Sequence, residues 1–404
     1  MKYIVLVGDG MAGKPLRELG SRTCLQKART PNMDRLAAEG EVGTARTIPK
    51  GFEPGSDVAN LSILGYDPKK YYTGRAPIEA EFRKIRLGPH DVAFRCNLVT
   101  LSAPCDNRTA VMRDFSAGHI TSKEAAGLIR FINKKLGDRD FVFYPGISYR
   151  HLMIWKKGQE KIRCTPPHDI TGRKVNGHLP EGKGGEILRS LMKDSYDLLL
   201  SHPVNKKRME QGHSPASSLW FWGQGKKLVV PKFKKKYGLK GALISAVDLT
   251  KGLGICAGFE NIHVRGATGY IDTNYTGKAN AALRALKTCD YVYVHVEAPD
   301  EAGHNGDIKA KIQAIEDFDE KVVGRVINGI KKFDDCRILL LPDHFTPIRA
   351  RTHTPEPVPF VIFGSGIRRD PAKNVQAYSE SICRMRKIRS FEKGHMLMDY
   401  FLNG

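Results

Sequence analysis

The chain has 404 residues, of which 41% are hydrophobic, and its Lys and Arg outnumber Asp and Glu by 65 to 43, which gives a formal charge of +22 at pH 7. This length is enough for one large or two moderate domains with a sizeable core. No apolar run reaches the roughly 18 residues of a membrane span, and Met1–Asp9 becomes polar too soon for a signal peptide. We therefore expect a soluble globular protein and no membrane partner.

Cysteine usage and charge indicate the cellular compartment and the kind of binding partner. The eight cysteines are scattered and form no Cys-x-x-Cys pair, which indicates free thiols in a reducing compartment, the cytoplasm. Basic residues concentrate at Lys206–Arg208, Lys232–Lys236 and Arg384–Arg389. Phe233 is the one aromatic residue within these stretches, which falls short of the repeated aromatic residues of a base-stacking surface, so a solvated basic surface is favoured over nucleic-acid binding. The sequence leaves the oligomeric state open.

The N-terminal stretch predicts a strand, a loop and a helix. Tyr3–Val7 is a short β-branched run typical of a central parallel strand, and it ends at Gly8-Asp9. Thr30 followed by Pro31 predicts a helix start with Thr30 as its cap, and Gly40 predicts its end. This order of elements indicates an α/β domain.

The middle of the chain has a different pattern, which predicts an inserted α+β domain over residues 86–219. The remaining residues, 1–85 and 220–404, would form the main domain; the alternative is a set of surface excursions on one domain. The predicted strands and helices of the insertion are Val92–Leu101, Phe141–Tyr144, His151–Trp155, Lys123–Lys135 and Glu186–Leu200.

After residue 220 the alternation of strands and helices resumes. A single long helix is predicted over Asp307–Lys332, because apolar residues recur there at three- and four-residue spacing from Ile308 to Ile330. Buried strands are predicted at Gly241–Val247, Tyr291–Val296, Arg337–Leu341 and Phe360–Phe363, and a helix at Asn280–Leu286.

A serine at a predicted helix start is the candidate nucleophile. Pro54 and Gly55 end one segment, and Ser56 opens an apolar run with helical spacing. Unpaired N–H groups and the helix dipole favour negative charge at that position. A simple N-cap is the alternative explanation for such a serine, and a hydroxyl nucleophile needs an activator such as a metal ion.

Three acids and three histidines are candidates to bind such a metal ion. Asp9, Asp300 and Asp343 each follow a predicted parallel strand, and ligands assemble at this edge of open α/β sheets. Oxygen and imidazole ligands without thiolate suit Mn, Zn, Co or Mg. The nearby histidines are His304, His344 and His353. With Ser56, these seven ligands divide into two sites, and paired metal ions clamp in-line phosphoryl transfer.

The same fragments resemble the archaeal-type 2,3-bisphosphoglycerate-independent phosphoglycerate mutases of the alkaline phosphatase superfamily. The resemblance runs in order along nearly the whole chain. The motifs that carry it are Asp9-Gly10-Met11, Thr30-Pro31-Asn32-Met33-Asp34, Gly55-Ser56-Asp57-Val58-Ala59-Asn60, Tyr71-Tyr72-Thr73-Gly74-Arg75, Asp272-Thr273-Asn274-Tyr275-Thr276-Gly277-Lys278 and Glu297-Ala298-Pro299-Asp300-Glu301-Ala302-Gly303-His304.

The resemblance implies an alkaline-phosphatase-like, mostly parallel sheet flanked by helices, and an isomerase of glycolysis and gluconeogenesis. Phosphate would pass between 3-phosphoglycerate and 2-phosphoglycerate through a phosphoserine, without 2,3-bisphosphoglycerate. It also implies that one metal ion is held by Asp9, Ser56, Asp343 and His344. The other would be held by Asp300, His304 and His353.

Substrate contacts are expected from cationic and polar residues. Arg grips a carboxylate or phosphate with two parallel hydrogen bonds, whereas Lys offers a point charge. The candidates are Arg75, Arg150, His168, Asp169 and Lys278. Asp114, Ser116 and His119 are looser candidates, and a surface salt bridge or a turn cap are the alternatives for Arg150 and Asp169.

The sequence departs from the family pattern at three positions, where the family usually has Pro for Gly8, an acid near Lys14 and Gly for Ala76. No expected ligand is lost. Two other functions stay open: a paralogous metal-dependent phosphotransferase or phosphatase, such as a homoserine-kinase-like enzyme, and a nucleic-acid-binding protein on a decayed phosphatase fold. The second would predict damaged ligands, and none is damaged here.

Overall fold

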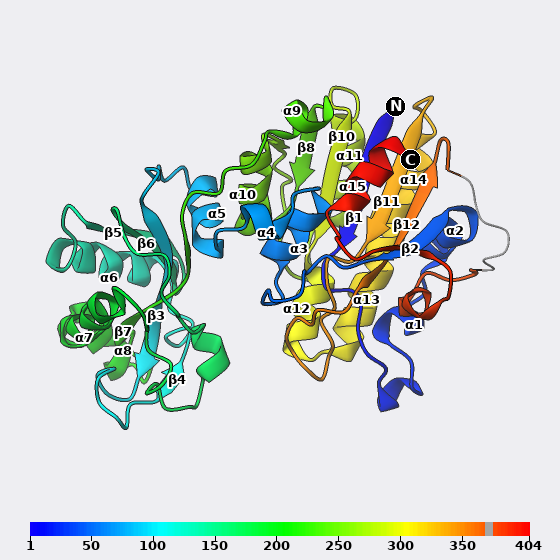
Figure 1. The fold of residues 1–404 in the computed structure, drawn as a ribbon. Helices are drawn as coiled ribbons and strands as arrows, with labels where there is room; N and C mark the ends of the chain where they lie inside the picture. Colours follow the sequence, from blue (N-terminus) through cyan, green and yellow to red (C-terminus); the bar gives the residue numbers. More distant parts are fainter. Residues whose placement is uncertain (368–374) are drawn as a thin grey trace. The chain divides into compact units, whose positions relative to one another are not determined.

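The computed structural model describes residues 1–367 and 375–404, which form two compact units (Figure 1). Unit 1 comprises Met1–Tyr72 and Val229–Gly404, and unit 2 comprises Thr73–Leu228. The insertion expected at 86–219 lies inside unit 2, which begins earlier and ends later because the elements at its two ends belong to its own core. Among the described residues, no helix combines the length and the apolar character that crossing a membrane requires.

Unit 1 is built on a sheet of eight described strands. Its strands are β1 (Lys2–Gly8), β2 (Glu41–Ala45), β8 (Gly241–Ile244), β9 (Glu260–Asn261), β10 (Tyr291–Val296), β11 (Cys336–Leu341), β12 (Val358–Gly364) and β13 (Arg389–Phe391). They lie in the order β13-β2-β12-β11-β1-β10-β8-β9. The pairs of β1 with β10 and with β11 are parallel, whereas β12 runs antiparallel to β11 and β2.

Helices accompany this sheet along the chain (Figure 1). The α-helices of unit 1 are α1 (Cys24–Lys27), α2 (Pro31–Glu39), α3 (Ser56–Ile63), α4 (Pro68–Tyr71), α9 (Phe233–Tyr237), α10 (Asp248–Ala257), α11 (Tyr275–Ala285), α12 (Ala298–Asn305), α13 (Ile308–Phe318), α14 (Arg325–Ile330) and α15 (Met396–Asn403). Shorter or irregular helices are η1 (Arg17–Leu19), η3 (Asp319–Gly324) and η4 (Glu380–Arg384). The fold confirms the expected α/β class with a mostly parallel sheet.

Two local expectations were wrong, and both concern the π-helical segment η3. The predicted helix over Asp307–Lys332 is interrupted by η3, which is a turn of π-helix. From Phe318 to Ile330 the apolar residues recur every four positions, which drifts by about 40° per step on a regular helix; the wider turn restores them to one buried face. Thr30 makes no side-chain cap on α2, because Asp319 of η3 accepts the N–H groups of Asn32 and Met33 instead.

Unit 2 is an antiparallel sheet with helices. Its strands are β3 (Val92–Leu101), β4 (Met112–Asp114), β5 (Phe141–Ile147), β6 (Arg150–Trp155) and β7 (Ser218–Gly225), and its helices are α5 (Arg75–Phe82), α6 (Ser122–Lys135), η2 (Pro167–Ile170), α7 (Gly185–Ser201) and α8 (Pro203–Glu210). Strand β3 is central and pairs with β4, β6 and β7. Both β3 and β7 contribute to one apolar core, which explains why unit 2 extends past residue 219.

Several of the expected basic patches have structural partners. Lys232 donates to the carbonyls of Ile255 and Cys256, at the end of α10. Arg208 is buried and pairs with Glu124 at 3.1 Å. These contacts account for part of the positive charge without any macromolecular partner.

A buried histidine in β6 predicts acid sensitivity of unit 2. Burial lowers the pKa of His151 to about 3 from its ordinary 6.5, and Nδ1 accepts the N–H of Gly146 at 2.8 Å. Between these pH values the unfolded chain binds a proton that the folded chain excludes. Acidification through this window therefore lowers the free energy of unfolding, by about 5 kcal/mol or less.

The measurement is unfolding by guanidinium at pH values from 4 to 7.5. Tryptophan fluorescence monitors the unfolding of unit 2, because Trp155, Trp220 and Trp222 all lie in that unit. His151→Gln should be less stable at pH 7 but flatter with pH than the wild type. The control is His90→Gln, which removes an exposed histidine. An unchanged pH slope in His151→Gln would contradict the assignment.

Candidate active site

The three acids expected at strand ends meet at one edge of the unit 1 sheet. Asp9 follows β1, Asp343 follows β11, and Asp300 lies in the first turn of α12, after β10. Because β10 and β11 flank β1 in parallel register, their carboxyl ends coincide. Asp9 and Asp343 are buried, and the Asp300 side chain is 14% exposed. The structure thus brings together side chains that are separated by more than 300 residues in the chain.

The first group of candidate ligands is Asp300, His304 and His353. His304 Nε2 lies 3.2 Å from Asp300 Oδ2, and His353 Nε2 lies 3.4 Å from Asp300 Oδ1. The two Nε2 atoms are 2.9 Å apart. Each histidine uses its other nitrogen on a backbone carbonyl, that of Arg351 or Pro54. This arrangement points both Nε2 lone pairs and a carboxylate at one position, as a metal site requires.

The second group is Asp9, Asp343, His344 and Ser56. His344 Nε2 lies 3.4 Å from Asp9 Oδ1, 3.4 Å from Asp343 Oδ2 and 3.1 Å from Ser56 Oγ. The rings of His344 and His353 are 4.0 Å apart, so the two groups are adjacent. Atoms of Asp9, Asp300 and His344 also lie within 4.8 Å of one another, which makes the groups contiguous.

The electrostatics of the second group fit a bound cation. Burial, Asp343 and Asp300 raise the pKa of Asp9 well above its ordinary value, and Asp9 Oδ1 is buried without a hydrogen-bond partner. Burial lowers the pKa of His344 to about 4, which keeps its imidazole neutral and able to bind a metal at neutral pH. Clustered buried carboxylates are costly unless a cation compensates them, so the donor set suits divalent ions.

Ser56 is not a helix cap, because Gly55 occupies that position and Ser56 is the first residue of α3. Four residues on, the buried Asn60 fixes the serine and a ligand together. Its Nδ2 donates to the Ser56 carbonyl at 2.7 Å and to Asp343 Oδ2 at 2.9 Å. The Tyr293 hydroxyl donates to the Asn60 amide oxygen. The start of α3 is thereby held against the carboxylate edge of the sheet.

Sequence reasoning missed two buried residues beside the candidate ligands, His295 and Glu297. His295 in β10 lies 3.4 Å from Asp9 Oδ2 and 3.3 Å from Glu297 Oε1, and an inward-facing histidine within a strand has no distinctive pattern. Lys278, expected to bind substrate, is fully buried, and its ammonium donates to Glu297 and to the His295 carbonyl. No face of Lys278 is open to a substrate, so we do not carry that contact forward.

In unit 2 the expected residues lie around an arginine cluster that includes a third, unforeseen guanidinium. Arg95 is buried in β3, pairs with Glu79 at 3.2 Å and stacks on Trp222 at 4.4 Å. Glu79 also lies 3.5 Å from Arg75. Burial, together with the charges of Arg75 and Arg150, lowers the pKa of Arg95 to about 10, although Glu79 opposes this shift. Arg95 is the one charged residue of β3, and the sequence pattern of that strand predicts only burial.

The remaining unit 2 candidates have mixed surroundings. The His168 ring packs 5.2 Å from Trp222 and 6.2 Å from Phe115, and its Nε2 lies 3.6 Å from Asp169. Arg150 is exposed, with its guanidinium 5.5 Å from the Tyr149 ring. The carboxylate of Asp114 instead accepts N–H groups of its own turn, including that of Ser116, and this is a structural role.

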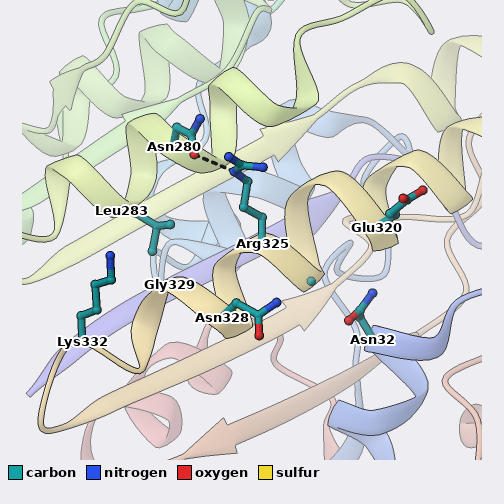
Figure 2. A pocket seen from close by; sticks show the side chains of 9 residues that line it. Asn32, Asn280, Leu283, Glu320, Arg325, Asn328, Gly329 and Lys332 are labelled. Atoms are coloured by element: carbon teal, nitrogen blue, oxygen red, sulfur yellow. Dashed lines mark hydrogen bonds between the residues drawn. The ribbon is translucent and has the colours of Figure 1, made fainter.

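A groove of about 650 Å³ lies elsewhere on unit 1 (Figure 2). It is lined by the ends of Asn32, Asn328 and Lys332, and by Arg325, whose Nε donates to Asn280 Oδ1 at 2.7 Å. It contains none of the predicted site residues.

Fold and site together define a two-unit α/β protein with two contiguous carboxylate–imidazole ligand groups beside a serine at a helix start. Comparison with known proteins identifies it further. A family model described as 2,3-bisphosphoglycerate-independent phosphoglycerate mutase matches residues 37–205. The chain is 53% identical over 403 residues to a probable mutase of this name from Geobacter sulfurreducens, covering 100% of both chains. It is 54% identical over 382 residues to the mutase of Methanothrix thermoacetophila, with 94% of each covered.

Solved structures agree. A Pyrococcus horikoshii protein matches with a TM-score of 0.81 at 30% identity, over 100% of this chain and 97% of that one. The cofactor-independent phosphoglycerate mutase of Thermoplasma acidophilum matches with a TM-score of 0.63 at 27% identity, over 99% and 100%. The chain belongs to the family of 2,3-bisphosphoglycerate-independent phosphoglycerate mutases, which are isomerases. The resemblance found in the sequence is confirmed.

Proposed function

We propose that this protein interconverts 3-phosphoglycerate and 2-phosphoglycerate through a phosphoserine at Ser56, with a divalent ion in each ligand group and no need for 2,3-bisphosphoglycerate. One observation carries the proposal. Ser56 Oγ, at the start of α3, lies 3.1 Å from His344 Nε2, where the two ligand groups adjoin. A hydroxyl in this position has both an anion-stabilising helix end and cation ligands around it.

The geometry supports the ligand assignment that the family resemblance implies. Asp300, His304 and His353 would hold one ion, and the other would be held by Asp9, Asp343, His344 and Ser56. Oxygen and nitrogen donors suit Mn, Zn, Co or Mg. Ions bound there would lower the pKa of the serine hydroxyl and neutralise charge on the phosphoryl oxygens.

Residues of the chain position the serine and the transferred phosphoryl group. Ser56 Oγ bonds to phosphorus while the bond from phosphorus to the C3 oxygen breaks, and the serine proton passes to the C3 oxygen. In the second transfer the C2 oxygen bonds to phosphorus, the bond from phosphorus to Ser56 Oγ breaks, and the C2 hydroxyl proton returns to Ser56. The N-terminus of α3 favours the negative charge of the transferred group. Asn60, bonded to Ser56 and Asp343, keeps the serine from moving relative to its ligands during both transfers.

The arginine cluster of unit 2 is proposed to bind the anionic groups of the substrate. Arg95 pairs with Glu79, which also lies 3.5 Å from Arg75. The charges of Arg75 and Arg150 lower the pKa of Arg95, so a bound anion would relieve the repulsion among the three guanidiniums. An ammonium near such a group is repelled by about 4 kcal/mol per pair at about 4 Å and an effective dielectric of about 20. This disfavours an amino-acid acceptor such as homoserine. His168 and Asp169 are proposed to contact the substrate hydroxyls.

The setting we propose is the cytoplasm, with a small phosphorylated metabolite rather than a nucleic acid as partner. All eight cysteines are free thiols, as a reducing compartment allows.

The test is an assay of the purified protein with Mn²⁺ and 3-phosphoglycerate, in which ³¹P NMR follows formation of 2-phosphoglycerate. We expect conversion with Mn²⁺, loss of activity on chelation, and recovery when a divalent ion is returned. Conversion that persists in metal-free protein, or the absence of 2-phosphoglycerate with every candidate ion, would overturn the proposal.

A further inference from the structure

One buried hydroxyl contacts both ligand groups. Thr346 lies in the loop between β11 and β12 and is fully buried. Its Oγ1 lies 2.5 Å from Asp300 Oδ1, in the first group, and 3.2 Å from His344 Nδ1, in the second. These contacts make it a link between ligands that arrive from β10 and from β11.

The chemistry of the three groups fixes where the protons lie. An ionised carboxylate only accepts hydrogen bonds, and a threonine hydroxyl has one proton and free acceptor lone pairs. Thr346 Oγ1 therefore donates to Asp300 and accepts from the Nδ1–H of His344. That tautomer leaves the Nε2 lone pair of His344 available on the side that faces Ser56 and Asp9.

The backbone around Thr346 holds this hydroxyl in place. Its N–H donates to the Ala12 carbonyl at 3.0 Å, and its own carbonyl accepts from the buried ammonium of Lys311 at 2.6 Å. The side chain also packs against two glycines. A Cβ at Gly10 would lie 2.4 Å from both Thr346 Oγ1 and Asp300 Oδ1, and one at Gly303 would lie 2.8 Å from Thr346 Cγ2. The hydroxyl thus has little freedom to turn elsewhere.

We propose that Thr346 is a positioning residue that couples the two metal sites, by orienting Asp300 in one and setting the tautomer of His344 in the other. The inference rests on the proposed two-metal function and names a residue that acts through the ligands. Groups that orient metal ligands from behind change metal affinity by about 10- to 100-fold when removed. Removing this single hydroxyl should therefore weaken the binding of both ions, whereas loss of one ligand should weaken the binding of mainly one ion.

The experiment is calorimetric titration of metal-free protein with Mn²⁺. Thr346→Val keeps the shape of the side chain and removes the hydroxyl, and Thr346→Ser keeps the hydroxyl. The control is Thr100→Val, which removes a hydroxyl bonded to the Pro215 carbonyl within unit 2. Thermal melting of each variant separates loss of folding from loss of binding.

We expect two bound ions in the wild type, both weakened at least about tenfold in Thr346→Val, and near-wild-type binding in Thr346→Ser and Thr100→Val. Unchanged binding in Thr346→Val, weakening of one ion alone, or equal weakening by Val and Ser would overturn the coupling role while leaving the proposed function in place. A wild-type protein that binds no ion would overturn both. If Thr346→Val does not fold, the Ser variant decides: weakened binding in it contradicts the inference, and retained binding supports it.

Discussion

Replacing Ser56 with alanine is expected to abolish turnover and leave the fold intact. Removal of a hydroxyl nucleophile in a concerted catalytic group costs up to about 10⁶-fold in rate. The structural cost is small because Gly55, rather than Ser56, caps α3; even a true cap contributes only about 1 kcal/mol. The measurement is the initial rate of 2-phosphoglycerate formation, together with the thermal midpoint.

The matched control lies in the same helix. Ser62 is fully buried, and its Oγ has no hydrogen-bond partner among the described residues. Ser62→Ala therefore removes an equivalent hydroxyl from α3 and should keep wild-type activity. Turnover by Ser56→Ala within about tenfold of the wild type would show that the serine carries no phosphoryl group.

The second large effect concerns the ligands. His304→Ala should remove one ion, because only Asp300 and His353 remain in its group, and should reduce turnover by about 10³-fold or more, since paired ions stabilise both oxygens of the transfer. Asp343→Asn should remove mainly the other ion. Elemental analysis of each purified variant, alongside its rate, checks both statements.

His263→Ala is the control, since it removes an exposed histidine from unit 1 and should retain both ions. Active wild-type protein without metal, or variants of His304 and Asp343 that lose the same ion, would contradict the division into two groups.

Much of this candidate site could be predicted because apolar runs in the sequence indicate where buried strands end. Asp9, Asp300 and Asp343 each follow a buried apolar run, and parallel strands bring such positions to one edge. The central strand β1 flanked by β10 and β11 is the simplest sheet that satisfies all three. The position of Ser56 at a helix start was also predicted, because it is a polar residue directly before an apolar run with helical spacing.

Other features depend on tertiary contacts that have no local signature. Asp319 of η3 accepts N–H groups at the start of α2, which lies 287 residues earlier in the chain, and no local pattern indicates this contact. His295 and Arg95 each lie inside an apolar strand, where periodicity predicts only burial. The partner of Lys278, the buried Glu297, could not be predicted either, because a lysine in a motif does not reveal what it pairs with.

The most direct measurement follows the fate of the glycerate. Wild-type protein with Mn²⁺ is given unlabelled 3-phosphoglycerate in the presence of isotopically labelled glycerate or labelled homoserine, and the products are separated. A mutase that returns the phosphoryl group from Ser56 to the same retained glycerate forms 2-phosphoglycerate free of label, and this is the result we predict. Labelled phosphoglycerate would contradict retention, and labelled phosphohomoserine would show that the enzyme is a phosphotransferase with an external acceptor.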